Sequence, residues 1–265
     1  MLIIKNSMVP LVKMENIWKR FGAVEALRGA YLDVYHGEIV GLVGDNGAGK
    51  STLMKILTGV YAPDSGTIYF EGKPVKFRSA ADSRALGIEM IYQNLALAPK
   101  QTVAENVFLG REIIKKYLGG VLTVINRKAM AEETKQILQR LGLELDPYRQ
   151  VSKLSGGQQQ AVAIARTLSL HLSPKLIIMD EPTAALAVKE VNRVLNLIRQ
   201  LKQQNISVIL ISHRLPDVLE VADRIFVMRR GQTVAMRHRD ETTLDEIIKL
   251  IIGGDASSTH DFITN

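Results

Sequence analysis

The sequence predicts an α/β fold whose core is a mostly parallel sheet interrupted by a helical insertion. Three observations predict this fold. A glycine-rich loop at residues 44–51 stands between a short apolar strand and a helix. Apolar strands alternate with helices on both sides of residues 94–152, where the pattern is helical. After this stretch, an apolar strand at residues 176–179 leads into the acidic pair Asp180-Glu181.

The composition limits the classes of protein to consider. A chain of 265 residues fits one α/β domain with an inserted subdomain. The chain has no cysteine, which excludes disulfides and thiolate metal sites and fits a reducing compartment. The longest apolar runs, such as residues 206–211, are far shorter than the roughly 18 residues that span a bilayer. Any membrane association is therefore expected to go through a partner. Residues 1–5 lack the features of a signal peptide and are expected to form a loose extension.

The net charge is +7, and the basic residues are spread along the chain. The densest run is Arg237-His238-Arg239. A solvated basic surface, with some charge directed at a nucleotide, accounts for this charge. A nucleic-acid partner is the alternative interpretation.

Strands dominate the first ninety residues. They are expected at residues 11–17, 30–34, 38–43, 66–70 and 88–92. A helix is expected at about residues 79–86. Within the helical stretch, Thr102-Val103-Ala104-Glu105 fits a capping box, and Asn126 can cap a helix that runs to Leu141, with Gly142 at its C-terminal end.

Parallel α/β alternation resumes after residue 158. A helix is expected to reach about Leu170, and a second helix follows the strand at residues 176–179. That second helix has one apolar face, formed by Val191, Val194, Leu195, Ile198 and Leu201. A buried strand at 206–212 and a hairpin around Arg230-Gly231 come next, and Thr243 begins a last helix that ends at Gly253-Gly254. The final dozen residues are polar and expected to be mobile.

The glycine-rich loop matches the pattern G-x-x-x-x-G-K-[ST] of phosphate-binding loops. Its residues are Gly44, Asp45, Asn46, Gly47, Ala48, Gly49, Lys50 and Ser51. Backbone N–H groups and the start of the following helix would hold phosphates, Lys50 would reach the β- and γ-phosphates, and Ser51 would bind Mg²⁺. A simple glycine turn is the alternative, and the position between a buried strand and a helix argues against it.

Four polar side chains are expected at the carboxyl edge of the parallel sheet, where such sheets bind ligands. Asp180 fits the role of holding Mg²⁺, and Glu181 could orient or deprotonate an attacking water. His213 follows the strand at 206–212 and could contact the γ-phosphate, and Gln93 follows the strand at 88–92 and could bind Mg²⁺ or water. Taken singly, each could be an ordinary residue at a strand end.

The segment Leu154-Ser155-Gly156-Gly157-Gln158 can start a second glycine-rich helix. Its free N–H groups and small side chains could accept an anion closely. A plain serine N-cap is the alternative interpretation. These motifs, in this order, resemble the ATP-binding cassette of ABC transporters over roughly residues 11–253.

The resemblance implies a P-loop cassette with an N-terminal antiparallel β subdomain and an inserted α-helical subdomain. It places the core at residues 11–93 and 166–253, the helical subdomain at about 94–165 and a flexible tail at 254–265. In that family two cassettes sandwich two ATP molecules. Each ATP is held by the phosphate-binding loop of one cassette and by the signature motif, here Ser155, Gly156, Gly157 and Gln158, of the other.

The resemblance also implies individual roles. Glu181 corresponds to the catalytic glutamate, His213 to the switch histidine and Lys50 to the loop lysine. Nucleotide contacts are expected from the loop residues through Thr52 and from Gln93, Asp180 and Phe21. Phe21 falls at the aromatic position that stacks on adenine, where tyrosine is usual and a core phenylalanine is the alternative. Magnesium ligands would be Ser51, Gln93 and Asp180.

Residues 44–52, 92–97 and 182–186 look most like cassettes of monosaccharide importers. Many of those carry two cassettes in one chain, whereas this chain has one and should pair with a second copy. The expected partners are a transmembrane permease and, indirectly, a sugar-binding protein, at the cytoplasmic face of the membrane. No nucleic acid is expected, although a soluble cassette that acts on ribosomes or nucleic acid is the alternative function.

Two positions depart from the family pattern. Ala187 stands where the D-loop usually has an aspartate, which puts the communication between two sites in question. Gln159-Gln160-Ala161 follows the signature in place of a more frequent pattern with an arginine. An inactive regulator is a further alternative, and four intact residues argue against it and favour an ATPase that drives transport: Lys50, Asp180, Glu181 and His213.

Overall fold

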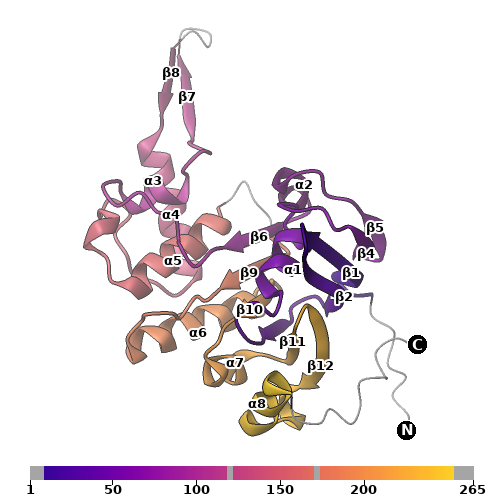
Figure 1. The fold of residues 1–265 in the computed structure, drawn as a ribbon. Coiled ribbons are helices and arrows are strands. Elements are labelled where there is room, and N and C mark those ends of the chain that lie inside the picture. The colour runs from indigo at the N-terminus through magenta and orange to yellow at the C-terminus, as the bar shows by residue number, and fades with distance from the viewer. Residues whose placement is uncertain (1–8, 118–121, 170–173, 254–265) are drawn as a thin grey trace, which may run out of the picture.

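A computed structural model describes residues 9–117, 122–169 and 174–253. It has two sheets packed on each other, helices on the outer face of the larger sheet, and a helical insert (residues 102–167) at one side, from which a narrow hairpin projects (Figure 1). The expected loose start and the expected mobile tail lie outside the described residues. The helix that was expected to reach about Leu170 ends at Thr167. Within those residues, no helix is both long and apolar enough to cross a membrane.

The larger sheet has six strands in the order β12-β11-β3-β10-β9-β6. They are β3 (Ile39–Val43), β6 (Ile88–Ile91), β9 (Leu176–Asp180), β10 (Ser207–Ile211), β11 (Arg224–Arg229) and β12 (Gln232–His238). Neighbours from β11 to β6 are parallel, and only β12 runs antiparallel. The predicted parallel core and the terminal hairpin are confirmed.

Both faces of this sheet are buried, because the apolar side chains of each strand alternate between two cores. In β3, Ile39 and Val43 join one core, whereas Val40 and Leu42 join the other. Between them, a Cβ on Gly41 would lie 2.3 Å from Val218 Cγ1, so glycine allows α7 (Leu215–Val221) to approach the sheet.

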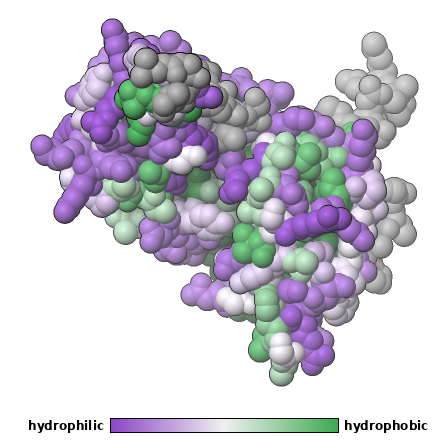
Figure 2. Space-filling view, turned by 90° about the horizontal axis from the view of Figure 1, so that it is seen from above, coloured by the Kyte–Doolittle hydropathy of each residue, from purple (hydrophilic) through white to green (hydrophobic). Residues whose placement is uncertain are grey.

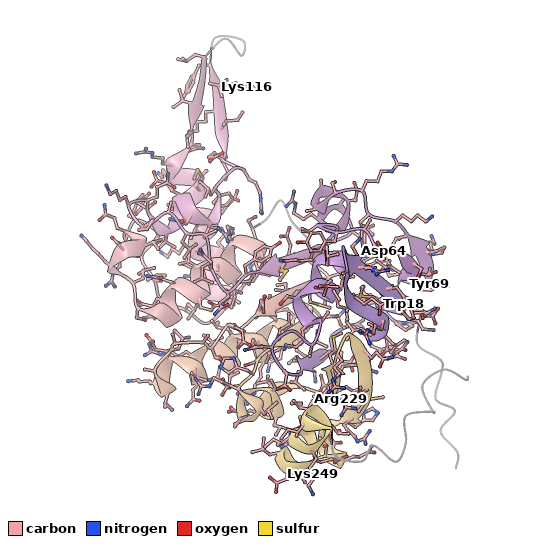
Figure 3. All side chains as sticks on the ribbon, viewed as in Figure 1. Trp18, Asp64, Tyr69, Lys116, Arg229 and Lys249 are labelled. Atoms are coloured by element: carbon pink, nitrogen blue, oxygen red, sulfur yellow. The ribbon has the colours of Figure 1, made fainter. Side chains whose placement is uncertain are left out.

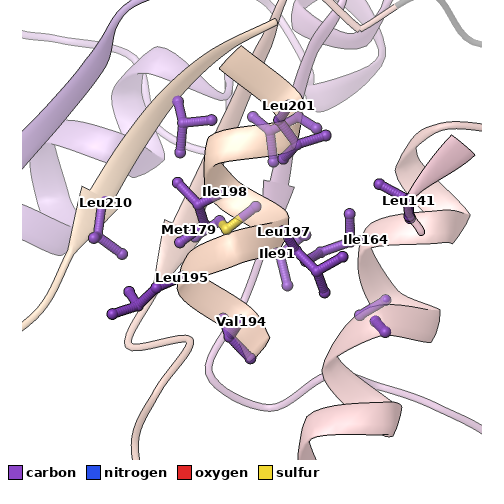
Figure 4. Packing of buried hydrophobic residues seen from close by; sticks show 14 of the residues in the cluster. Ile91, Leu141, Ile164, Met179, Val194, Leu195, Leu197, Ile198, Leu201 and Leu210 are labelled. Atoms are coloured by element: carbon purple, nitrogen blue, oxygen red, sulfur yellow. The ribbon is translucent and has the colours of Figure 1, made fainter. Parts of the chain in front are cut away.

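The first core lies under α6 (Val188–Gln203), whose Val194, Leu195, Ile198 and Leu201 are buried against the sheet and α5 (Gly156–Thr167) (Figure 4). The apolar face predicted for this helix is therefore confirmed. The last helix, α8 (Leu244–Ile252), also packs on this side; Thr243 caps it and Gly253 ends it in the left-handed conformation, as predicted.

The second core lies between the larger sheet, α1 (Lys50–Leu57) and an antiparallel sheet of order β2-β1-β4-β5. Its strands are β1 (Val12–Phe21), β2 (Val24–Val34), β4 (Ser65–Phe70) and β5 (Lys73–Val75), and α2 (Ala80–Ala85) follows them. Strands β1 and β2 are longer than predicted. Their distal ends are mostly exposed, so those residues lack the apolar alternation that marks a strand.

The helical insert contains α3 (Val103–Val107), α4 (Arg127–Arg140), a short 3₁₀ turn η2 (Val151–Lys153) and α5. The predicted capping box is confirmed, because Thr102 Oγ1 accepts from the Glu105 N–H at 3.2 Å and Glu105 Oε2 accepts from the Thr102 N–H at 2.9 Å. Asn126 caps α4, and Gly142 follows it with φ of +62°.

A hairpin within the insert corrects the prediction of a purely helical stretch. Strands β7 (Ile114–Tyr117) and β8 (Leu122–Ile125) pair antiparallel. Every described residue of the two strands is exposed, so no half-buried face produces the alternation that predicts a strand. The β-branched and aromatic side chains at Ile114, Tyr117, Val124 and Ile125 are the sequence signal that favours a hairpin here.

Arg224, in β11, connects the larger sheet to the antiparallel sheet through ion pairs. The residue is only 6% exposed, and its guanidinium contacts Asp33 Oδ1 at 2.9 Å and Glu38 Oε2 at 3.0 Å. It also lies between the rings of Tyr35 and Phe226, at 5.0 and 5.2 Å from their centroids. Burial by itself lowers the pKa of Arg224, but the hydrogen bonds with Glu38 and the charges of Asp33 and Glu38 outweigh it and raise the pKa. The group therefore stays charged.

We expect Arg224→Ala to lower the free energy of unfolding by about 3 to 5 kcal/mol, because it leaves two buried carboxylates without their cation. The matched control is Arg199→Ala, which removes an exposed pair with Glu220 at 2.8 Å and should lose ~1 kcal/mol or less. Urea unfolding followed by circular dichroism measures both changes. Equal losses in the two variants would contradict the role of Arg224.

Candidate nucleotide-binding site

The phosphate-binding loop is held tightly against β11. Gly44 has φ of +147°, and a Cβ there would lie 2.1 Å from the Met228 carbonyl oxygen. Only glycine fits at this contact. Helix α1 begins directly after the loop at Lys50, so the free N–H groups of its first turn face the space that the loop encloses.

A cavity of about 930 Å³ opens over this loop. The residues predicted from the sequence that line it are Gly44, Asp45, Asn46, Gly47, Ala48, Gly49, Lys50, Ser51, Thr52, Gln93, Asp180, Glu181 and His213. They come from four separate parts of the chain. Two further walls were not predicted: the start of β2, at Val24, and the end of α8, at Ile248, Ile251 and Ile252.

Lys50 reaches back across the loop. Its Nζ donates to the carbonyl oxygens of Gly44 at 2.6 Å and Asp45 at 2.9 Å. Burial lowers the pKa of Lys50, and the negative charges of Glu181 and Asp180 oppose this effect. The arrangement keeps a cation at the point where a phosphate chain would meet the loop.

Two adjacent carboxylates stand at the end of β9. Burial raises the pKa of Asp180, and the neighbouring charge of Glu181 raises it further. Glu181 has φ of +52°, a strained value for a residue with a side chain, and its N–H donates to the Ile211 carbonyl oxygen at 2.9 Å.

Glu181 and His213 contact each other directly. His213 Nδ1 lies 2.8 Å from Glu181 Oε2, and the backbone N–H of His213 donates to Oε1 at 3.0 Å. Ser212 Oγ also approaches Oε2 at 3.4 Å. Ser212 was not among the predicted site residues, although its position directly before His213 at a strand end was a usable signal. These contacts hold the carboxylate of Glu181 in one orientation.

A buried brace supports the chain on both sides of this pair. Thr183 Oγ1 donates to Asp217 Oδ2 at 2.7 Å, and Arg214 Nε lies 3.2 Å from the same oxygen. Thr183 lies in the predicted segment 182–186, but its pairing with Asp217 could not be predicted, because the two residues are separated by 34 positions and share no pattern. The brace links the segment after Glu181 to the segment after His213.

The signature segment lies outside the cavity over the phosphate-binding loop. Ser155 is the N-cap of α5 and forms a capping box with Gln158, whose Oε1 accepts from the Ser155 N–H at 3.0 Å. Gly156 borders an adjacent cavity of about 490 Å³ together with Gln93 and Glu181. Within one chain, the start of α5 therefore does not complete the walls around the loop.

The two signature glycines permit a close approach to the segment after Glu181. A Cβ on Gly156 would lie 2.6 Å from Leu186 Cδ2, and one on Gly157 would lie 3.1 Å from Glu190 Cβ. A hydrogen bond with Ser155 lowers the pKa of Glu190, and a hydrogen bond with the Gly157 backbone acts in the same direction. The sequence analysis did not identify Glu190, which shares no motif with the signature.

The two segments that depart from the family pattern, at Ala187 and at Gln159, lie in different surroundings. Ala187 is the N-cap of α6 and offers no side-chain hydrogen bond to it. Gln159 Nε2 lies 3.4 Å from the Val151 carbonyl oxygen and 3.3 Å from that of Leu154. Gln159 thereby ties the helix to the segment that precedes the signature.

Phe21 stands at the end of β1, opposite Val24 across the β1–β2 turn. Its ring meets that of Tyr61 edge to face at 5.1 Å, and Lys19 Nζ lies 5.5 Å from its centroid. The side chain is 42% exposed, which is unlike a core phenylalanine. The partner strand begins at the cavity wall, whereas Phe21 itself is not among the lining residues.

Three oxygen-bearing side chains, Ser51, Gln93 and Asp180, line the same cavity. No group of three or more His, Cys, Asp or Glu side chains able to hold a metal occurs among residues 9–117, 122–169 and 174–253. A hydroxyl, an amide and one carboxylate are hard donors that suit Mg²⁺ held mainly by phosphates and water. They do not suit a metal caged wholly by protein.

Comparison with known proteins places this geometry in a family. The family model of ABC transporters matches residues 27–184. The xylose/arabinose import ATP-binding protein of Sulfolobus acidocaldarius is 46% identical over 92% of this chain and 94% of that protein. The fructose import ATP-binding protein of Rhizobium meliloti is 43% identical over the same shares. The ribose import ATP-binding protein of Yersinia pestis is also 43% identical, but the chain spans only 47% of its length.

Solved structures agree with the fold. An ATP-binding cassette of an ABC transporter in its ADP conformation has a TM-score of 0.78 and 32% identity, over 92% of this chain and 99% of that one. A dimeric cassette in a post-hydrolysis state, bound to ADP and Pi, has a TM-score of 0.69 and 27% identity, over 86% and 98%. The expected mostly parallel core, antiparallel sheet and helical insert are thereby confirmed. With the loop, the two carboxylates and the histidine gathered at one sheet edge, this chain belongs to the ABC transporter family and is one of its ATP-hydrolysing cassettes.

Proposed function

We propose that this cassette powers the import of a monosaccharide through a membrane permease, as a homodimer that closes around two molecules of Mg-ATP. The sugar class rests on relatives named for import of xylose or arabinose, fructose and ribose. In this proposal the chain lies at the cytoplasmic face of the membrane through its permease. It forms a single cassette, with the core at residues 11–93 and 166–253 and the helical subdomain at about 94–165.

One observation carries the proposal. The cavity over the phosphate-binding loop holds Lys50, Glu181 and His213 but lacks the signature residues of its own chain. A site formed by one chain can therefore contact the phosphates of a bound nucleotide from one side only. The start of α5, with Ser155 as N-cap, offers the same kind of anion-binding helix end and would cover the phosphates of a second copy.

The residues then take the following roles. Backbone N–H groups of the loop and Lys50 bind the β- and γ-phosphates, and Phe21 stacks on the adenine. Glu181, oriented by His213 and Ser212, positions the attacking water and accepts its proton. Ser51, Gln93 and Asp180 would hold Mg²⁺, which neutralises charge on the phosphate oxygens when bound. The ion would also favour the charged form of Asp180, whose pKa burial raises.

We expect Glu181→Gln to retain ATP binding and to lower turnover about 10² to 10⁴-fold, because general-base catalysis is removed while the side-chain shape is kept. Steady-state phosphate release and nucleotide titration measure the two properties. Glu132→Gln is the matched control, since Glu132 is exposed on α4 and lies outside the cavity, and it should leave both properties unchanged. Turnover of Glu181→Gln at the wild-type rate would rule out this role.

The dimer proposal predicts complementation between two inactive variants. Lys50→Ala disables the phosphate-binding loop, and Ser155→Arg blocks the signature with a bulky side chain. In a mixed dimer one site combines both defects and the other is intact, so mixing should restore about a quarter of the wild-type turnover if the sites act independently. Differently tagged chains verify that mixed dimers form. Mixed dimers without any turnover would contradict sites shared in this way.

The transport proposal predicts co-purification with a permease in detergent, and stimulation of ATP turnover when a binding protein delivers a pentose or hexose. Turnover in the reconstituted complex, measured across a panel of sugars, tests the substrate class. An amino acid or a peptide delivered in the same way is the control. Association with RNA or DNA that falls steeply with salt, in place of the permease, would favour the nucleic-acid alternative.

A further inference from the structure

The hairpin β7–β8 projects from the helical insert, and its described residues line neither cavity at the nucleotide site (Figure 1). Lys116 lies near its outer end, well away from the two sheets (Figure 3). An isolated two-stranded hairpin is at best marginally stable in water. This one nonetheless exposes five large apolar side chains, each 46 to 51% exposed. They are Ile114, Tyr117, Leu122, Val124 and Ile125.

The apolar side chains occupy both faces of the hairpin. Residues that pair directly across two strands lie on the same face, and successive pairs alternate between faces. Ile114 pairs with Ile125 on one face, and Tyr117 pairs with Leu122 on the other. Val124 shares the face of Tyr117 and Leu122, because it pairs with Lys115. Neither face is a polar, solvated side.

A two-faced apolar hairpin distinguishes between kinds of partner. A protein surface that docks on one face would leave the apolar residues of the other face in water. A lipid interface surrounds whatever enters it and can cover both faces at once. Tyrosine and aliphatic side chains are also the types that settle at such an interface.

The positive charge of the hairpin also fits an anionic lipid interface. The two strands, residues 114–117 and 122–125, carry two basic side chains, Lys115 and Lys116, and no Asp or Glu. Arg127, which follows them, pairs with Glu105 at 3.4 Å. Lys115 and Lys116 lie on opposite faces of the hairpin, and no salt bridge engages either of them in the described part of the chain. Long lysine side chains can place their charge in a headgroup layer while their stems lie among apolar groups. In Figure 2, the hairpin side of the molecule faces the viewer and shows apolar patches within strongly hydrophilic surface.

We propose that the hairpin β7–β8 is a membrane-contact arm that inserts its apolar side chains into the interface of an anionic lipid bilayer. The lysines on its two faces bind lipid phosphates there. The arm gives the cassette a second point of attachment, in addition to the permease. Because it does not line the nucleotide cavity, the contact is independent of the proposed sugar import and can be tested without transport.

The first test is flotation of the purified full chain with vesicles at low ionic strength. The wild-type chain should float with vesicles that contain phosphatidylglycerol and much less with phosphatidylcholine alone. The double variant Lys115→Gln/Lys116→Gln should bind about 25-fold more weakly, because each basic residue near an anionic surface contributes a factor of about five. Tyr117→Ser/Leu122→Ser should lose about tenfold or more through its smaller buried apolar area.

The matched control is Lys73→Gln/Lys76→Gln, which removes the same charge from exposed positions on the antiparallel-sheet side. It should bind vesicles nearly as the wild-type chain does. All variants should keep wild-type ATP turnover without vesicles, which also shows that they are folded. No flotation of the wild-type chain with anionic vesicles, or an equal loss in the two lysine variants, would overturn the proposal.

A second test reports insertion directly. The chain has a single tryptophan, Trp18, which lies in the antiparallel sheet far from the hairpin (Figure 3). Trp18→Phe/Tyr117→Trp moves the fluorophore onto the arm, and its emission should shift to the blue when phosphatidylglycerol vesicles are added. Trp18→Phe/Tyr148→Trp places it at an exposed site elsewhere in the insert and should show no shift. A shift that requires the permease in the vesicles would point to a protein partner and contradict the proposal.

Discussion

The register of three parallel strands is the constraint on which the nucleotide site depends. In the pairing of β3, β10 and β9, Leu42 lies opposite Ile211, and Ile211 lies opposite Asp180. The strands therefore end at one level, and the phosphate-binding loop, Glu181 and His213 leave the sheet at a common edge. A shift of one residue in β9 would turn Asp180 to the other face of the sheet. The alternation of apolar side chains between two cores prevents that shift.

Charge and backbone strain are concentrated at this edge. Lys50, Asp180 and Glu181 share a partly buried space, where burial lowers the pKa of Lys50 and raises that of Asp180. Both effects oppose the charged forms, and the phosphates and Mg²⁺ of the proposed substrate would reverse them. The strained backbone at Glu181 is held by its hydrogen bond to Ile211 and by the contacts of its side chain with His213.

The segment that follows Glu181 also reaches the signature of its own chain. Directly after Glu181, the chain passes Thr183, which is bonded to Asp217, and then Leu186 and Glu190, which contact the signature glycines of α5. A displacement of α5 by a nucleotide on a second copy would therefore act on the chain next to Glu181. Ala187 has no polar side chain, whereas the packing of Leu186 and the carboxylate of Glu190 connect this segment to the signature of the same chain.

Local chemistry encodes the features that could be predicted from the amino-acid sequence. The glycine-rich loop, the capping box at Thr102 and Glu105 and the alternation of strands and helices could be predicted, since each depends on neighbouring residues. Four features are visible in the folded chain alone: the order of the strands, the support of Glu181 by Ser212, the position of Glu190 at the signature and the exposed hairpin β7–β8. The first three features bring together residues that are far apart in the chain, and the packing of the fold sets the distances between those residues. The hairpin has no buried face, so its sequence lacks the alternation of apolar and polar residues that predicts a strand.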